Sequence, residues 1–463
     1  MSFISLDFIV LMVGALLAYY LVPNKYRIYV LLLFSSVFIG YYHFFYLLIS
    51  IVVALFSYGA GIVIEKTEKN KWHGRVYSAS MVAIIGFWIF CRNATSILGG
   101  GEFLFPLGIS FYSFQAIAYL TEIYWEEERA ERNLPAFLLY MMFFLKFVSG
   151  PIERPADLLP QIKKQQQASY EMMTFGMKLL FIGLVKKLVI ADRLEPYLNA
   201  GFDAPQMVSS EQLLMSCLIY PIYLYADFSG YTDMAIGGAQ LFGLNLSPNF
   251  NRPFISQSTS ELWRRWHMSL SLWVRDYIFM PLSSVCRRWG EAGIIGSSVI
   301  TFVLLGVWHG VGITFVIYGL IQGLSIAYEM MAKGFRRKVS EKVGKKVFVT
   351  WSVIRMYLIF AFSLIFFRCH GIKDAWCFVC QMFRPSMDHW ENVTLGIPAH
   401  FRTVVIIAIV LMFVYEYCQE KYEILKKMEQ LKPIYRWSVY YVLFMAFLAF
   451  GKMGADNFVY VQF

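Results

Sequence analysis

Residues 292–328, AGIIGSSVITFVLLGVWHGVGITFVIYGLIQGLSIAY, contain no formally charged residue, and their one histidine is His309. As a single helix at about 1.5 Å per residue, this run would exceed about 50 Å, whereas the hydrocarbon core of a membrane is about 30 Å thick. Two helices are therefore required. Basic residues flank both ends of the run, namely Arg287, Arg288, Lys333, Arg336 and Arg337. Because both basic ends should lie on the same side of the membrane, the run predicts a helical hairpin that turns at the glycine cluster GVWHGVG, residues 306–312.

The composition of the whole chain is that of a membrane protein. Of its 463 residues, 58% are hydrophobic and only 16% are charged, which is more apolar surface than a soluble core of this size can hide. The stretch 4–22 lacks a basic leader and a small-residue cleavage site, so we interpret it as a span rather than a signal peptide. The apolar segments that could be spans or parts of spans are 4–22, 28–42, 44–64, 77–91, 104–121, 135–148, 176–190, 212–226, 267–282, 292–308, 311–328, 349–367, 401–417 and 437–450.

Several of these segments are too short to cross a membrane alone, so we expect roughly ten to twelve crossings, with the remainder as re-entrant or interfacial helices. The sequence shows no long soluble insertion, internal repeat or low-complexity tract. The predicted fold class is therefore an all-α polytopic membrane protein in which residues 1–463 form a single integral-membrane domain.

The net charge of +10 arises from short basic clusters between the apolar segments. Three such clusters, within residues 66–75, 333–346 and 421–436, should face the cytoplasm by the positive-inside rule. Counting spans outward from them predicts that both termini are extracytoplasmic. The charge therefore reports orientation in a lipid membrane, and we expect no nucleic-acid partner.

The cysteines give no sign of a metal site or a disulfide framework. They number seven, an odd count, and Cys377 and Cys380 form the one CxxC pair. Without a second pair of ligands a zinc site is not expected, and we interpret these two cysteines as residues of a helix face. We expect no bound metal and no bound cofactor.

Residues 262–279, LWRRWHMSLSLWVRDYIF, combine charge with tryptophan in an otherwise apolar chain. On a helix of about 100° per residue, Arg264, His267, Ser271 and Arg275 fall within a sector of about 80°. Each ionised group placed at mid-membrane costs at least about 2.5 kcal/mol, so this stripe cannot face hydrocarbon. Two interpretations remain open: the stripe faces a polar cavity, or the helix lies at the cytoplasmic surface with its arginines toward phosphate headgroups.

His309 is expected near the tip of the predicted hairpin, beside Gly306, Gly310 and Gly312. A lone histidine on an apolar helix is often a hydrogen-bonded core residue. The neighbouring glycines, however, would let backbone and substrate approach closely, and an ionisable group at such depth points to function. A neutral imidazole can act as a general base on a hydroxyl nucleophile.

A further polar segment, YADFSGYTD at 225–233, predicts a broken helix around Gly230. We interpret its carboxylates, Asp227 and Asp233, as a structural hydrogen-bond cluster that pairs with arginines such as Arg252 or Arg264, with a substrate site as the alternative. Tyr231 lies in the same segment.

The segment NLSPNFNRPF, residues 245–254, is rich in turn formers and leads into the charged helix. We expect a loop that lines a cytoplasmic opening. Asn249, Asn251 and Arg252 are its candidate ligands for anionic phosphate groups.

These motifs together resemble the membrane-bound O-acyltransferase superfamily, specifically its bacterial alginate O-acetyltransferase branch. The resemblance is carried by SPNFNRPFISQSTSELWRRWHMSLSLWVRDYIF, by GVWHG with His309 placed 42 residues after His267, and by DFSGYTDMAIG and SGPIERP. It implies a ring of about eleven transmembrane helices around a central catalytic tunnel, with a cytoplasmic channel for the acyl donor and an outer funnel for the acceptor. It also implies that His309 is the catalytic residue and that His267 is a second functional position nearer the cytoplasm.

The predicted function is that of a membrane-bound O-acyltransferase in a bacterial cytoplasmic membrane. The co-substrate would be acetyl-CoA or a carrier-protein thioester, whose phosphates would meet Arg264, Arg275 or Arg252. Trp308 N–H or a backbone amide at the glycine turn would stabilise the oxyanion. The acceptor hydroxyl would belong to an extracytoplasmic polysaccharide or to an acetyl-relay protein. A transporter or flippase, for which intramembrane carboxylates are equally natural, and a non-enzymatic export scaffold are the alternatives.

Overall fold

A computed structural model describes residues 3–98, 106–164, 168–384 and 399–452 of the chain. Every regular element within these residues is helical, so the predicted all-α membrane fold is confirmed. Eight stretches of the described residues are long and apolar enough to cross a membrane, which leaves the expected number near eleven unconfirmed. They are Phe44–Lys66, His73–Asn93, Ser210–Leu241, Met268–His309, Ile313–Met331, Lys345–Arg368, Phe401–Tyr422 and Pro433–Phe450.

The helices fall into two compact units. The first unit takes its described residues from Met1–Ile182 and Tyr231–Pro248, and the second takes them from Gly183–Gly230 and Asn249–Ala455. Helix α9 (Tyr170–Val185) and helix α11 (Ser210–Leu241) contribute residues to both units.

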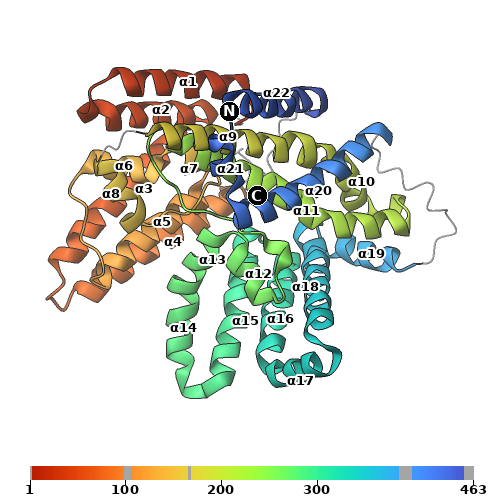
Figure 1. The fold of residues 1–463 in the computed structure, drawn as a ribbon. Helices are drawn as coiled ribbons and strands as arrows, with labels where there is room; N and C mark the ends of the chain where they lie inside the picture. The colour runs from red at the N-terminus through yellow and green to blue at the C-terminus, as the bar shows by residue number, and fades with distance from the viewer. Residues whose placement is uncertain (1–2, 99–105, 165–167, 385–398, 453–463) are drawn as a thin grey trace. The chain divides into compact units, whose positions relative to one another are not determined.

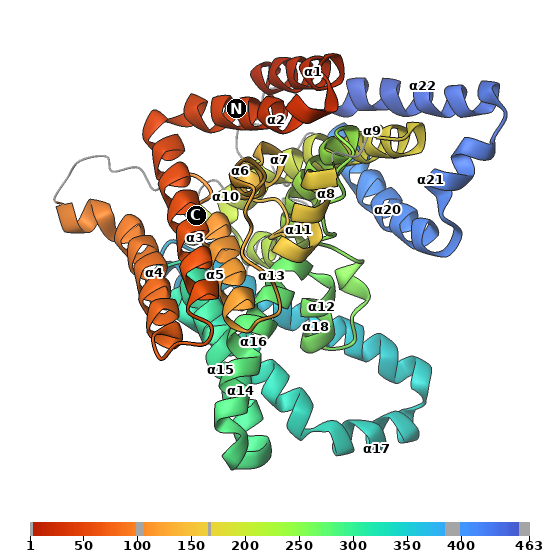
Figure 2. The same cartoon turned by 90° about the vertical axis from the view of Figure 1, so that its left-hand side faces the viewer.

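In the first unit, α1 and α2 form an antiparallel pair, and α3, α4 and α5 lie side by side (Figures 1 and 2). The helices of this unit are α1 (Leu6–Leu21), α2 (Arg27–Tyr42), α3 (Phe44–Lys66), α4 (His73–Leu98), α5 (Ile109–Tyr124), α6 (Leu134–Met142), α7 (Phe144–Phe147) and α8 (Pro155–Lys164).

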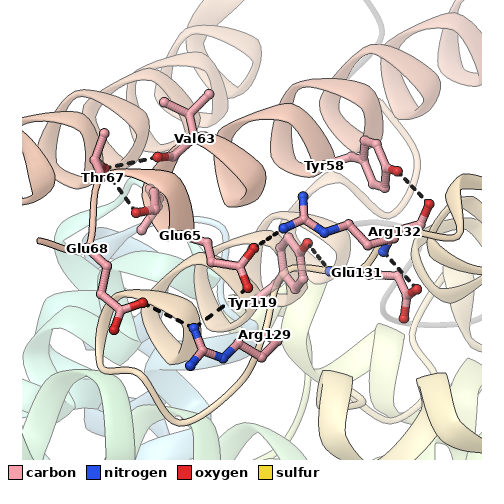
Figure 3. A network of polar contacts seen from close by, with 10 residues as sticks. Tyr58, Val63, Glu65, Thr67, Glu68, Tyr119, Arg129, Glu131 and Arg132 are labelled. Atoms are coloured by element: carbon pink, nitrogen blue, oxygen red, sulfur yellow. Dashed lines mark hydrogen bonds and ion pairs between the residues drawn. The ribbon is translucent and has the colours of Figure 1, made fainter.

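A network of ion pairs and hydrogen bonds ties the end of α3 to the segment after α5 (Figure 3). Arg129 pairs with Glu68 at 3.1 Å, and Arg132 pairs with Glu65. Tyr119 on α5 accepts a hydrogen bond at 3.0 Å from the backbone amide of Glu131. These contacts attach the segment that follows α5 to the end of α3 and to Tyr119.

In the second unit, α14, α15, α16 and α18 run alongside one another, and α17 joins the ends of α16 and α18 (Figure 1). The helices of this unit are α10 (Asp192–Asp203), α12 (Thr259–Arg265), α13 (Met268–Val274), α14 (Met280–Val285), α15 (Gly290–His309), α16 (Ile313–Met331), α17 (Lys333–Val343), α18 (Lys345–Arg368), α19 (Ile372–Met382), α20 (Ala399–Tyr422), α21 (Ile424–Lys427) and α22 (Pro433–Phe450).

The predicted hairpin in residues 292–328 is confirmed as α15 and α16, with its turn at Gly310–Gly312. Glycines allow the two helices to approach closely. A Cβ atom added to Gly306 would lie 2.2 Å from the carbonyl oxygen of Phe315, and one added to Gly319 would lie 2.3 Å from that of Phe302. These distances are far below van der Waals contact, so a side chain at either glycine would push the helices apart.

The predicted break in residues 225–233 is wrong, because α11 continues through them as a regular helix. Asp227 is neutralised within the protein by Lys187, so the backbone does not need to open toward water. Gly230 instead permits close packing, since a Cβ atom there would lie 2.8 Å from the carbonyl oxygen of Gly183.

Candidate active site

The α15–α16 hairpin places His309 at the last position of α15, among aromatic side chains. Its ring centroid lies 4.5 Å from that of Trp308, 5.1 Å from that of Phe367 and 6.1 Å from that of Tyr318. The side chain is 8% exposed, so the imidazole packs against protein rather than standing in lipid. Gly306 and Gly310 serve this packing: a Cβ atom on Gly310 would overlap the ring of Phe315. Gly306 and Gly310 thus both lie directly against Phe315 of α16.

His267 lies at a sharp break between α12 and α13, so the prediction of one helix through residues 262–279 is wrong. Its φ and ψ angles are 44° and 53°, in the left-handed region that non-glycine residues seldom adopt. The imidazole is 1% exposed and packs edge-on against the ring of Phe228 at 4.7 Å. His267 and His309 both belong to the second unit.

The segment before α12 explains why the helix breaks at this point. The backbone amide of Met268 donates to the carbonyl oxygen of Asn249 at 2.9 Å, and the amide of Asn251 donates to that of Arg265 at 2.9 Å. Because the loop supplies partners to backbone groups on both sides of His267, the chain can leave the helical conformation without burying unsatisfied groups.

Trp266 fills the centre of an aromatic cluster on the other side of the break. Its ring lies within 5.2 to 6.1 Å of four aromatic rings. These belong to Tyr225, Phe250, Phe254 and Phe360. Rigid packing of Trp266 fixes the backbone from which the next residue, His267, projects.

Buried charges gather in the same unit around a wide helical turn, the π-helix Lys186–Ala191. Lys187 Nζ lies 2.8 Å from an Asp192 carboxylate oxygen and 2.6 Å from one of Asp227. The neighbouring Lys186 lies 3.3 Å from Glu416, which also accepts a 2.6 Å hydrogen bond from Tyr225. Each of these charges has an opposite partner, as burial requires.

Comparison with known proteins identifies the family. The family model of MBOAT, the membrane-bound O-acyltransferase family, matches residues 31–372.

The chain belongs to the membrane-bound O-acyltransferase family.

Among its relatives, the probable alginate O-acetylase AlgI of Azotobacter vinelandii is 31% identical, over 80% of this chain and 75% of that protein. The peptidoglycan O-acetyltransferase of Helicobacter pylori is 26% identical, over 94% of this chain and 91% of that protein. The teichoic acid D-alanyltransferase of Bacillus subtilis is 31% identical, over 44% of this chain and 54% of that protein.

The acyltransferase does not form the polar stripe predicted from the helical wheel. The helix break turns His267 inward, whereas Arg264 and Arg275 are exposed. Arg275 pairs with Asp276 at 2.6 Å, and Ser271 Oγ donates to the carbonyl oxygen of Trp266 at 3.1 Å. The residues of the predicted stripe are therefore separated: the imidazole of His267 is buried, whereas the two arginines are exposed.

The candidate phosphate ligands of the 245–254 loop differ in their exposure to solvent and in their partners. Asn251 is exposed. Arg252 is mostly buried and forms an ion pair with Glu420, which neutralises its charge. Asn249 is fully buried, and its carbonyl oxygen accepts from the backbone amide of Met268, the residue after His267.

The three candidates of the 225–233 segment are divided between the units. Asp227 belongs to the second unit and pairs with Lys187, not with Arg252 or Arg264 as predicted. Tyr231 belongs to the first unit, where its ring stacks on that of Phe3 at 4.3 Å. Asp233 also belongs to the first unit and is half-buried.

Lys187 and Asp192 are the residues of the site region that the sequence interpretation missed. Both lie in VKKLVIAD, residues 185–192, at the end of a segment that we treated as a plain apolar span. Two adjacent lysines inside an apolar run are a signal of buried ion pairs, because isolated charges there would be too costly. That signal was available in the sequence.

Proposed function

We propose that this acyltransferase moves an acetyl group from a thioester on the cytoplasmic side to a hydroxyl group on the opposite side of the membrane. The observation that supports this most is that both histidines are buried in the second unit, His309 at the end of α15 and His267 at the break between α12 and α13. Family membership favours an acyltransferase over the transporter and the export scaffold.

The distribution of basic residues supports the direction of transfer. Arg287 and Arg288 precede α15, and Lys333 follows α16, so the base of the hairpin is basic while His309 lies at its tip. A helix of 20 residues is about 30 Å long. With the basic end in the cytoplasm, the tip of the hairpin points toward the acceptor side.

The proposed reaction is a direct acyl transfer. The neutral imidazole of His309 accepts the proton of the acceptor hydroxyl as the hydroxyl oxygen attacks the thioester carbonyl carbon. The tetrahedral intermediate collapses when the carbon–sulfur bond breaks, and the imidazolium returns the proton to the departing thiolate. The products are an O-acetyl ester and a free thiol, and the enzyme ends the cycle in its starting protonation state.

Other residues would guide the donor. The exposed Arg264 is the strongest candidate for its phosphates. Arg275 and Arg252 are weaker candidates, because Asp276 and Glu420 respectively already neutralise them. His267 would lie along the path of the thioester before it reaches His309. Asp227 serves in this scheme as a partner of Lys187 that holds α11 to the π-helix, rather than as a ligand.

The acceptor is proposed from the names of the relatives, which act on alginate, peptidoglycan and teichoic acid. We propose a hydroxyl of an extracytoplasmic polysaccharide, or of a relay protein that completes the transfer, with the enzyme in a bacterial cytoplasmic membrane.

The test is acetyl transfer from labelled acetyl-CoA by the purified protein in detergent or liposomes. His309→Ala should lower turnover by roughly 10²-fold to 10⁴-fold, the usual contribution of a general base. His267→Ala should also lower it. His370→Ala is the matched control, because this histidine is 71% exposed and should leave turnover unchanged. Full turnover in both His309→Ala and His267→Ala would contradict the proposal.

A further inference from the structure

Both the backbone and the side chain of Asn249 form hydrogen bonds with the residues that follow His267. Its carbonyl oxygen accepts from the amide of Met268 at 2.9 Å. Its side-chain Oδ1 accepts from the amide of Ser269 at 3.1 Å and from Ser269 Oγ at 2.6 Å. Three hydrogen bonds therefore fix the position and the orientation of this amide relative to the break that carries His267.

The orientation of the Asn249 amide follows from chemistry. The Ser269 backbone amide can only donate, so the side-chain atom that faces it must be the oxygen. The Nδ2 group, with its two N–H donors, must then point away from Ser269.

That Nδ2 group is buried, and among the described residues it has no hydrogen-bond partner. The residue as a whole is 1% exposed. Leaving a buried donor unsatisfied costs about 1–3 kcal/mol, so a fixed donor of this kind beside a candidate catalytic residue calls for an explanation.

We propose that Asn249 is a catalytic residue whose Nδ2 group donates a hydrogen bond to the carbonyl oxygen of the bound thioester, most strongly when that oxygen becomes an oxyanion. The inference rests on the proposed acyl transfer. As the acceptor oxygen bonds to the carbonyl carbon, the π electrons of the C=O bond move onto its oxygen, and they return when the carbon–sulfur bond breaks. A donor that is already oriented stabilises this charge without reorganising. Asn249 thereby takes the role that the sequence interpretation gave to Trp308 or to a backbone amide.

The test is Asn249→Asp, which keeps the shape and the acceptor oxygen for Ser269 but replaces the two N–H donors by an anionic oxygen. The kcat for acetyl-CoA should fall about 10²-fold to 10³-fold, the usual loss for one oxyanion donor, while KM changes little. Binding of S-ethyl-CoA, a thioether without a carbonyl oxygen, should be unchanged. Asn245→Asp is the matched control: it places the same charge on an exposed residue of the same loop and should keep the wild-type kcat.

Thermal unfolding of each variant separates a folding defect from a chemical one. Should Asn249→Asp fail to fold, Asn249→Ala, which keeps the backbone bond to Met268, replaces it with the same expected loss of kcat. A kcat within about threefold of wild type, or an equal loss of S-ethyl-CoA binding, overturns the role of Asn249 provided that His309→Ala is inactive. If His309→Ala is active as well, the proposed function fails first.

Discussion

The ion pairs around Arg129 in the first unit and those around Lys187 in the second use the same side-chain chemistry in different surroundings. The Arg129 side chain is 76% exposed beside Glu65 and Glu68, whereas Lys187 is 5% exposed between two buried carboxylates. An exposed pair exchanges contacts with water for contacts with protein and gains at most about 1 kcal/mol. A buried pair has already lost its water, so each partner depends on the other. The difference indicates that only the second network constrains the fold strongly.

The largest expected effect is that of Lys187→Met. The methionine fills the volume of the lysine stem but leaves Asp192 and Asp227 without their counter-charge, and breaking a buried ion pair from one side costs about 3–5 kcal/mol. The free energy of unfolding in detergent micelles measures this loss.

The double variant Lys187→Met with Asp227→Asn should recover part of that stability, because one of the unpaired carboxylates is removed. If the losses of unfolding free energy in the two single variants added up to the loss in the double variant, Lys187 and Asp227 would not interact. The buried ion pairs would then be no stronger than the exposed ones around Arg129.

An intermediate effect is expected at Glu131, which lies outside the membrane spans in the first unit. Burial alone would raise its pKa. The 2.8 Å ion pair with Lys163 and the amides of Asn133 and Arg132 outweigh burial and hold the pKa below its usual value. A depressed pKa contributes stability above the unfolded-state value of about 4.3, and this contribution is lost as the pH falls through the folded-state value.

Glu131→Gln should therefore cost about 1 kcal/mol at pH 7, because water screens the pair through the half-exposed Lys163, and less in acid, where the wild-type carboxylate is itself protonated. Unfolding of both proteins followed from pH 7 to pH 3 measures the difference. If the difference in unfolding free energy between the wild type and Glu131→Gln grew as the pH fell, the lowered pKa of Glu131 would be contradicted.

The smallest effect is expected from Arg129→Ala, which should lower the free energy of unfolding by at most about 0.5 kcal/mol. Salt at 1 M should reduce this loss further by screening the exposed charges. Unfolding in low and high salt provides the comparison. If Arg129→Ala lost as much unfolding free energy as Lys187→Met, exposure to solvent would not explain a difference in strength between the two networks.

The sequence was sufficient for those features that depend on local composition and length. The hairpin of α15 and α16 could be predicted because its length, its missing charges and its glycines all lie within one run of residues. The break at His267 could not, because a regular wheel pattern gives no sign of Asn249, which is 18 residues earlier and opens the helix by hydrogen bonding. The partner of Asp227 was also misjudged: Lys187 is 40 residues away in sequence, and only the folded chain brings the two together.

The hairpin has a consequence for how the protein is made. A pair of helices with basic residues at both open ends should enter the membrane tip first, so the residue at the tip must pass through the bilayer during synthesis. A lysine or arginine there would carry its charge and cost about 2.5–3.5 kcal/mol on the insertion scale. An imidazole can make the passage as a neutral ring. A histidine at the tip of the hairpin, position 309, can therefore cross the bilayer without carrying a charge.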